Sequence, residues 1–443
     1  MAYQETKTTG YGERVGNSFK SIGTGFLLFI AGTVVLWWNE GRAVKTAKML
    51  EEAQGVTVEM EHPNKIDPAL DGELVIASAV ATTEDSLVDD KFGFGATAIQ
   101  LSRKVEYYQW VEHKEEKSED KLGGKEVTTT TYTYEKQWVS SPVQSSQFKD
   151  PEYQKLNMVL YTAEDQTLYA ENVSFGAYKL NEGQIASISS REPVILDLTD
   201  AQLEAWDKST KNVYERFYGV QTSTAPLAAE KEAVADSAVT TVADSISQEN
   251  KKDYEYVHQV GNVLYFGMSA DSPQVGDVRI TFEKVVPAMV TIIAQVNGDT
   301  FKPYKAKNGK KFSTLRMGKK DADEIYEEEE ETNNILLWVL RIVGIMMVIG
   351  GLKGLFSFVI TVLKVVPFIS NIANFGANLV AGVIGFVWSL LIIAIAWLFY
   401  RPVLGITLLV IAGVLIWIFG FKGKDKIKEF ADKQKAKNAG QPA

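Results

Sequence analysis

IGTGFLLFIAGTVVLWW, residues 22–38, is a run of seventeen residues without a charged side chain. At 1.5 Å per residue such a helix is roughly 25 Å long, the short end of what crosses a bilayer. The run ends at Trp37 and Trp38, and indole rings favour the boundary between lipid and water. A cleaved signal peptide is the alternative, but Trp37-Trp38-Asn39-Glu40 does not look like a small-residue cleavage site. The sequence therefore predicts a retained transmembrane helix.

The other end of the chain, residues 335–421, is also strongly apolar. It predicts three more spans, at Ile335–Leu352, Ile372–Phe399 and Val403–Phe421. Only Tyr400-Arg401-Pro402 separate the last two, so we expect a tight helical hairpin. For residues 353–370 three interpretations remain open: an extension of the second span, a re-entrant segment, or a segment lying in the interface.

Charge divides the chain in the same way. Residues 1–21 carry a net +1 and residues 335–443 a net +8; since the whole chain carries -10, residues 22–334 carry -19. Such an acidic region repels phosphates, so no nucleic-acid partner is predicted.

The basic tail, residues 422–443, sets the predicted orientation. It holds seven Lys against three acidic residues, which by the positive-inside bias makes this end cytoplasmic and also favours anionic membrane lipids. With four spans, residues 1–21 are then cytoplasmic and residues 39–334 lie outside. Arg42, Lys45 and Lys48 oppose this orientation, but the C-terminal charge is larger.

Several kinds of chemistry are excluded or disfavoured. The chain has no Cys, which excludes disulfides, thiolate metal sites and cysteine nucleophiles. His62, His113 and His258 lack metal-ligand spacing, and neither a GxSxG nor a Walker sequence is present. The acidic pair Asp89-Asp90 is interpreted as solvated surface. We therefore predict no cofactor and no metal, and an enzyme is the less favoured function.

The middle of the chain predicts a β-rich α+β domain. Arg42–Gln54 first continues the membrane helix as an amphipathic segment along the interface. Strands rich in β-branched and aromatic residues follow, at Val56–Val58, Glu73–Val80, Ile99–Val111, Thr128–Trp138, Val263–Met268, Asp277–Lys284 and Met289–Val296. A helix starts near Leu198–Trp206. Residues 225–250 lack aromatic residues and are predicted to be a flexible insertion.

Within this domain, Val105–Val111 and Thr129–Val139 predict a long aromatic hairpin joined by the charged loop Glu112–Lys125. Its aromatic residues suit a β core, which we favour, or a ligand site. The predicted fold class is thus an α-helical membrane region of four spans, one N-terminal plus three C-terminal, with a large β-rich α+β extracytoplasmic domain.

Five short strings resemble signatures of the transmembrane protein 43 (LUMA) family, and they occur in the same order. They are Asn39-Glu40-Gly41-Arg42-Ala43 with Lys45-Thr46-Ala47, then Tyr108-Gln109-Trp110-Val111-Glu112, Tyr132–Trp138, Gly276–Phe282 and Trp397–Pro402. Asn374 and Gly376 also match the family pattern. The layout of one span plus three fits as well.

The resemblance implies a four-span scaffold with both ends cytoplasmic and a large luminal domain. Members in animal cells reside in the endoplasmic reticulum and inner nuclear membrane, where they self-associate and associate with lamins and emerin; a lipid-linked enzymatic role and a channel role have also been suggested. This chain departs from the animal pattern in its 225–250 insertion and its lack of Cys. In a bacterium the location would be the inner membrane, and the lamin and emerin partners would not carry over.

Two sets of polar residues are candidate sites. Asn39, Glu40, Gly41 and Arg42 follow the first span, and Tyr400, Arg401 and Pro402 emerge on the same face, so we predict a contact between Glu40 and Arg401. A lipid or catalytic role and ordinary interface chemistry are the alternatives. Asn371, Asn374 and Asn378 share one face of the third span, which predicts helix packing or a wet cavity.

The function predicted from the sequence is a membrane scaffold that self-associates and binds other membrane proteins. The alternative is an interfacial enzyme acting on lipid, or an ion channel, that uses the polar residues at the outer interface.

Overall fold

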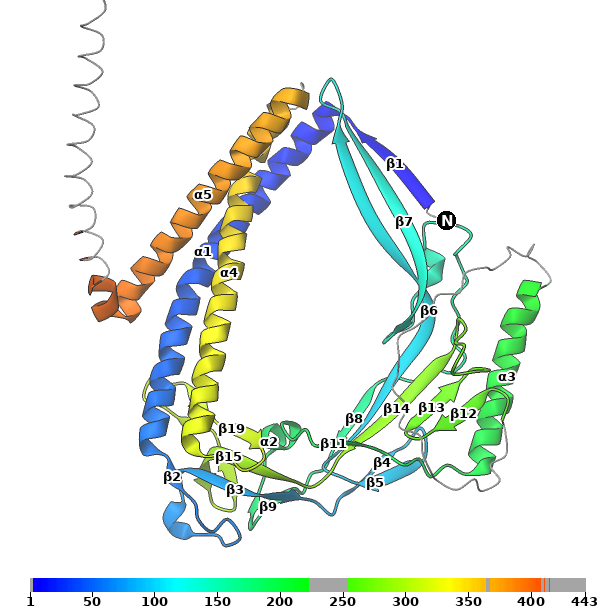
Figure 1. Ribbon diagram of the computed structural model, residues 1–443, viewed down its shortest axis with the longest axis vertical. Helices are drawn as coiled ribbons and strands as arrows, with labels where there is room; N and C mark the ends of the chain where they lie inside the picture. Colours follow the sequence, from blue (N-terminus) through cyan, green and yellow to red (C-terminus); the bar gives the residue numbers. More distant parts are fainter. Residues whose placement is uncertain (1–2, 223–253, 364–366, 408–409, 411–413, 415–443) are drawn as a thin grey trace, which may run out of the picture.

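The computed structural model describes residues 3–222, 254–363, 367–407, 410 and 414. Figure 1 shows three long helices on one side and two β-sheets on the other, which meet at both ends to form a ring. The long helices are α1 (Tyr11–Val56), α4 (Ala322–Leu363) and α5 (Pro367–Tyr400). Each contains a window long and apolar enough to cross a membrane. Two shorter helices, α2 (Glu182–Ala186) and α3 (Asp200–Thr222), belong to the domain.

The predicted spans in 22–38, 335–352 and 372–399 are helical, and each helix extends beyond its predicted span. The acidic run Glu327–Glu331 and the segment after Leu352 both continue α4, so residues 353–363 extend the helix of the second predicted span, and their placement in the bilayer stays a prediction. The fourth predicted span lies largely outside the described residues, as do the 225–250 insertion and the basic tail.

The first sheet has eight strands, in the order β1-β7-β6-β14-β13-β12, with β8 beside β6 and β11 beside β14. Its strands are β1 (Tyr3–Thr9), β6 (Gln100–Asp120), β7 (Glu126–Val139), β8 (Gln166–Tyr169), β11 (Arg191–Pro193), β12 (Val257–Val260), β13 (Val263–Phe266) and β14 (Val278–Val285). The predicted α+β domain is thus β-rich, as expected.

The second sheet has seven strands, in the order β19-β15-β16-β10-β9-β3-β2, with β15 also paired to β3. They are β2 (Val58–Glu59), β3 (Leu74–Thr82), β9 (Ser174–Phe175), β10 (Tyr178–Lys179), β15 (Ala288–Asn297), β16 (Thr300–Lys302) and β19 (Thr314–Met317). Two small hairpins complete the domain: β4 (Ser86–Asp89) with β5 (Phe94–Thr97), and β17 (Tyr304–Lys305) with β18 (Lys311–Phe312).

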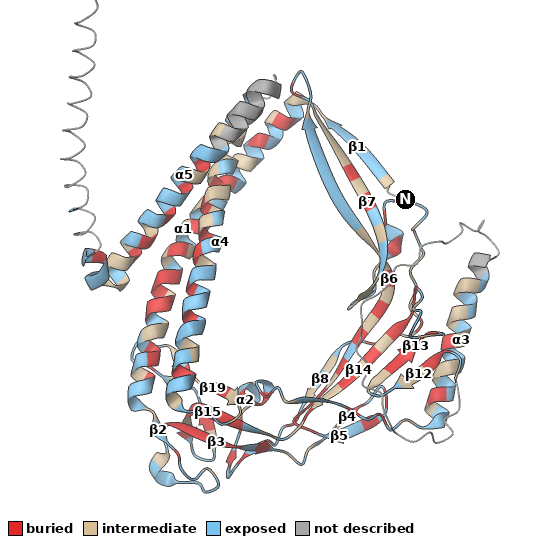
Figure 2. Cartoon of the chain, viewed as in Figure 1, coloured by how far each residue is buried: buried red, intermediate tan, exposed pale blue. Residues whose placement is uncertain are grey.

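The aromatic hairpin is longer than the sequence indicated. Its strands β6 and β7 pair from Tyr107 opposite Val139 to Asp120 opposite Glu126, so the predicted loop Glu112–Lys125 is wrong over most of its length. Charged residues suggested a loop, but here they lie opposite a row of β-branched threonines, which favour the extended backbone. Figure 2 shows the outer half of β6 exposed and that of β7 mostly half-buried.

A hydrophobic cluster joins the helices to the second sheet. Met49, Leu50 and Ala53 of α1 are buried in it, together with Ile325 and Tyr326 of α4. The prediction that Arg42–Gln54 lies along the membrane interface is therefore wrong, because its apolar face is covered by the domain.

Glycine residues allow the backbones of α1 and α4 to approach each other closely. A Cβ added to Gly25 would lie 2.7 Å from the carbonyl oxygen of Gly351, and one on Gly354 would lie 2.8 Å from Cα of Gly25. Close backbone approach through small residues is the usual way in which helices associate in lipid, where the hydrophobic effect gives little help. Of the glycines predicted to pack in the third span, Gly385 does contact α4, whereas a Cβ on Gly376 or Gly382 would meet no atom of the described residues within 4 Å.

The N-terminal strand was not predicted. Tyr3–Thr9 pairs along its whole length with residues 126–132 of β7. Residues 1–21 and 39–334 were predicted to lie on opposite sides of the bilayer; that sidedness remains a prediction, but the two regions touch.

Candidate functional site

A buried polar cluster joins the three long helices where the first predicted span ends. We call it the helix junction; its members are Asn39, Glu40, Gly41 and Arg42 of α1, Asn333 and Arg341 of α4, and Trp397 and Tyr400 of α5. Asn39 and Glu40 have no exposed surface, and Asn333 and Arg341 are 6 % and 7 % exposed.

Glu40 is the centre of the helix junction. Its Oε1 accepts a hydrogen bond from Arg341 Nε at 2.6 Å, and its Oε2 accepts one from the Trp397 indole at 2.9 Å. The Arg341 guanidinium also lies over two indole rings, 4.7 Å from the centre of Trp338 and 5.6 Å from that of Trp397. The carboxylate therefore has a cation and two helices as partners, which is how a charge is tolerated away from water.

The predicted contact of Glu40 with Arg401 is wrong, because Arg341 takes that place. Arg401 follows the last residue of α5 and is partly exposed, and its backbone N–H bonds to Trp397. Arg341 was missed although one signal was available: it is the lone ionisable residue in the predicted span Ile335–Leu352, and such residues generally have a partner.

Amides close the rest of the helix junction. Asn39 Nδ2 donates to the Leu337 carbonyl at 2.9 Å, and Arg42 Nη1 donates to Asn333 Oδ1 at 2.9 Å. Asn333 Nδ2 in turn donates to the Ala43 carbonyl at 3.1 Å. Each bond crosses between α1 and α4, so Asn39 and Arg42 act as interhelical ties.

The predicted meeting of the two chain segments is confirmed at Gly41. A Cβ there would lie 2.6 Å from Cζ of Tyr400, so only glycine admits the ring. Trp37 packs edge-on against Tyr400 as well, with ring centres 5.9 Å apart. Pro402 begins a further helical stretch, of which the structure describes residues 402–407, 410 and 414.

The asparagine face of α5 is less defined. The side chains of Asn371 and Asn374 lie outside what the structure describes. Asn378 is exposed, so at this position no packing on another described helix is seen.

Three of the five family-like strings form one patch of the first sheet. Residues 108–112 of β6 lie between the Tyr132–Trp138 string of β7 and the loop that begins β14. Gln109 is 1 % exposed; its amide donates to the Met158 carbonyl, and its carbonyl oxygen accepts from Val143 N–H. Glu112 accepts from the Tyr134 hydroxyl at 2.7 Å and from the Lys149 N–H at 2.6 Å.

The aromatic residues of this patch pack on each other. Trp110 lies edge-on to Tyr153 with ring centres 5.0 Å apart, and Tyr108 lies 5.3 Å from Trp138. Tyr107 is buried in the main cluster of the sheet. Tyr108, Trp110 and Trp138 pack on neighbouring rings but are half-buried and lie outside the hydrophobic clusters, so for them the choice between a β core and a ligand site stays a prediction.

Asp277, within the Gly276–Phe282 string, is buried beneath the patch at 1 % exposure. Its Oδ2 accepts from the Tyr265 hydroxyl at 2.5 Å, while Oδ1 has no hydrogen-bond partner among the described residues. Burial raises the pKa of Asp277 to about 6. Asp89 is also buried, at 2 %, in an ion pair with Arg103, so its interpretation as solvated surface is wrong, because an Arg partner allows a carboxylate to leave water.

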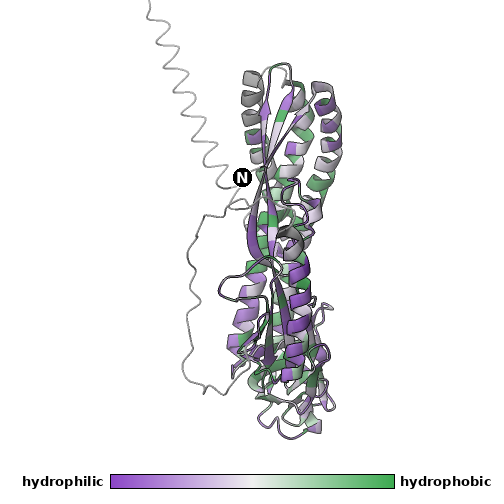
Figure 3. Cartoon of the chain, turned by 90° about the vertical axis from the view of Figure 1, so that its right-hand side faces the viewer, coloured by the Kyte–Doolittle hydropathy of each residue, from purple (hydrophilic) through white to green (hydrophobic). Residues whose placement is uncertain are grey.

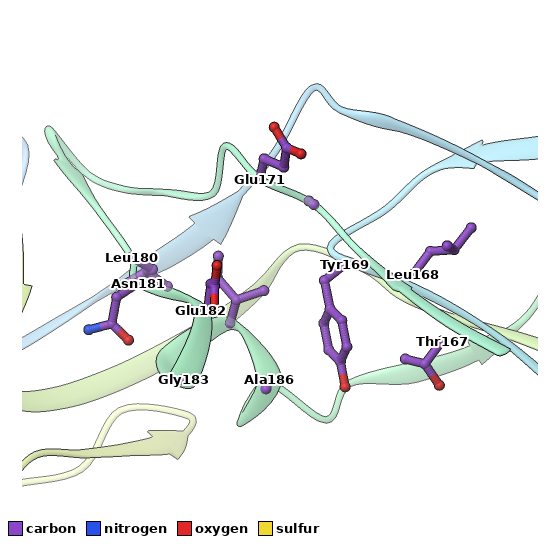
Figure 4. A pocket seen from close by; sticks show the side chains of 11 residues that line it. Thr167, Leu168, Tyr169, Glu171, Leu180, Asn181, Glu182, Gly183 and Ala186 are labelled. Atoms are coloured by element: carbon purple, nitrogen blue, oxygen red, sulfur yellow. The ribbon is translucent and has the colours of Figure 1, made fainter.

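An open groove of about 1260 Å³ lies between β8 and α2, away from both features. Figure 4 shows Tyr169 along one wall and Glu182 on the other, with Glu171 at the rim. None of the predicted site residues lines it. Its side chains form no cluster that could hold a metal, and the described residues contain no group of three His, Cys, Asp or Glu suited to one.

Comparison with known proteins gives consistent matches. A family model described as transmembrane protein 43 matches residues 107–402, which include the strand patch and two of the three junction helices, but not Asn39–Arg42. The chain is 29 % identical to transmembrane protein 43 of Rattus norvegicus over 393 residues, covering 89 % of this chain and 88 % of the relative. It is 27 % identical to that of Homo sapiens over 408 residues (92 % and 90 %), and 24 % identical to the Drosophila melanogaster homolog over 400 (89 % and 92 %). No solved structure matches.

Proposed function

The chain belongs to the transmembrane protein 43 family, and from this premise we propose that it is a membrane scaffold that self-associates and binds other membrane proteins. In this proposal the helix junction fixes how the β-rich domain is held against the bilayer. The domain then presents a surface of constant orientation to its partners.

One observation carries the proposal: Glu40 is fully buried, and both of its carboxylate oxygens are bonded within the chain. A general base or nucleophile has to reach a substrate, whereas this carboxylate is closed off by Arg341 and Trp397. A buried pair of this kind holds helices in one register, which is the best-supported use of such pairs. The helix junction therefore supports a structural role.

The attachment of the domain supports the same role. α1 and α4 continue without a break from the helix junction into the hydrophobic cluster with β3 and β15. A rigid connection of this kind transmits the orientation of the helices to the sheets, as a scaffold requires.

The test is co-purification of two differently tagged full-length copies from one membrane, followed by native mass measurement in a mild detergent and in nanodiscs. Capture of the second copy and a mass above that of one chain are expected. A strictly monomeric protein in both environments would contradict self-association.

A second measurement separates the scaffold from the enzyme and channel alternatives. The purified protein is placed in liposomes, and lipid turnover and ion flux are followed beside Arg341→Met. The proposal expects neither activity. Turnover or flux that is present in the wild type and lost in Arg341→Met would overturn it.

A further inference from the structure

The outer half of the β6–β7 hairpin, together with β1, forms a polar extension that we call the arm: residues 3–9, 112–120 and 126–134. Residues 113–119 and 4–8 are all exposed, and no arm residue belongs to the four hydrophobic clusters. The middle strand of the arm is mostly half-buried, and Thr130 and Tyr132 are buried, but a narrow sheet that packs on no hydrophobic cluster has little to stabilise it by itself. The arm therefore lacks the packing partner that such a structure needs.

The tip of the arm docks on the start of α1. Arg14, 7 % exposed, donates to Asp120 at 2.7 Å and to the Gly124 carbonyl at 3.0 Å. Gly124 has φ +75°, and a Cβ there would lie 2.4 Å from the Tyr11 ring. The tip is thus held at the end of α1 that is far from the domain cores.

This docking places the arm at the depth of the membrane spans. From Glu112 to Asp120 the arm extends about 27 Å along β6, and from Arg14 to Trp38 α1 extends about 36 Å. Starting from the tip beside Arg14, the arm therefore reaches the level of most of the α1 segment that the sequence assigns to lipid, on the opposite side of the ring (Figure 1).

The arm is too polar to contact the hydrocarbon of a lipid bilayer. Residues 112–120 contain five acidic residues and two Lys, and such side chains are not solvated by hydrocarbon. The opposite side of the ring is apolar and suits lipid: Leu390 of α5 is 47 % exposed and Phe26 of α1 is 53 % exposed. Figure 3 shows this contrast between the purple arm and the greener helices. Whatever covers the arm must be polar at membrane depth.

We propose that the partner of the arm is a second copy of this chain, with the long helices facing lipid and the arms facing one another in a polar interior. This inference rests on the proposed self-association and names its surface. A second copy in the same membrane carries an identical polar arm at the same depth. An ordinary membrane-protein partner would present apolar surface there.

Charge and strand order indicate β1 as the contact within the arm. β1 is the outermost strand of the sheet, and among the described strands only β7 pairs with it, which leaves its other edge open. Unpaired edges of this length are templates for another strand. β1 is also neutral, with one Glu and one Lys, whereas residues 112–120 carry -3 and would repel their counterparts. Copies therefore meet at β1 and leave the acidic strand in water.

The absence of Cys makes the test direct. Thr6→Cys on the exposed edge of β1 is expected to give dimers with a short bismaleimide in intact membranes, with a several-fold excess over Leu390→Cys on the lipid face. Lys117→Cys is expected to react with a membrane-impermeant maleimide. The pair Thr6→Cys and Thr129→Cys, which are opposite in the ladder, checks that β1 stays on β7 in the membrane.

Native mass measured on the same samples separates the two proposals. Multimers without Thr6→Cys dimers, or Thr6→Cys products that contain a different protein, would overturn the arm contact and leave self-association standing. Monomers alone would defeat the proposed function itself. Loss of the Thr6–Thr129 cross-link in membranes would also overturn the arm contact.

Discussion

Replacing Arg341 with Met should strongly destabilise the helix bundle. The substitution keeps most of the side-chain volume but removes the cation, so Glu40 is left fully buried with only the Trp397 indole as a partner. Breaking a buried ion pair from one side costs about 3–5 kcal/mol. For a chain of this size that loss lowers the melting temperature by about 3–5 °C.

The assay is thermal unfolding of the purified protein in one detergent, with Arg401→Met as the matched control. Arg401 lies near the same level but does not contact Glu40, so its removal is expected to cost less than about 1 kcal/mol. The double variant Glu40→Gln, Arg341→Met removes both charges and should recover much of the loss, since an uncharged pair carries no desolvation penalty. Equal melting temperatures for the two Arg variants, or a double variant as unstable as Arg341→Met, would refute the pairing.

Three further predictions use the same unfolding assay. Gly41→Ala places a Cβ 2.6 Å from the Tyr400 ring and is expected to cost about 1–3 kcal/mol, a loss that Tyr400→Leu should relieve; no relief would mean that the ring is not the obstacle. Gly354→Leu should cost about 3 kcal/mol because the α1 backbone lies 2.8 Å from the new Cβ, whereas Gly382→Leu, with nothing within 4 Å, should be tolerated, and equal effects would contradict the glycine contact. Asp277 has a folded-state pKa of about 6, above its ordinary 3.8, so the folded chain holds the proton more tightly and wild-type stability falls as pH rises from about 4 to 6. Asp277→Asn should remove this fall, worth about 3 kcal/mol, and the same pH slope in both proteins would argue against it.

Some parts of the structure could be predicted because their signal is local. The run 22–38 is apolar over a full span, and β14 and β15 have the β-branched composition of strands. These features depend on one segment and its solvent, so composition and period are enough to identify them.

Other features could not be predicted, because they depend on which distant segments contact one another in the folded chain. Nothing near Glu40 in the sequence distinguishes Arg341 from Arg401 as its partner; the choice follows from the glycine contact that sets the register of α4 on α1. Asp89 was misinterpreted for the same reason, since its partner Arg103 reaches it only through the folded strands.

The sequence by itself determined that this is a membrane protein with an acidic β-rich domain, because the free energy of burying apolar runs is set by each run alone. Only the tertiary structure decided that the domain packs on both α1 and α4, that Glu40 pairs with Arg341, and that β1 pairs with β7. The Glu40–Arg341 and β1–β7 contacts join segments more than 100 positions apart, and so does the cluster in which α1 meets α4. Their energies arise from geometry that no single segment contains.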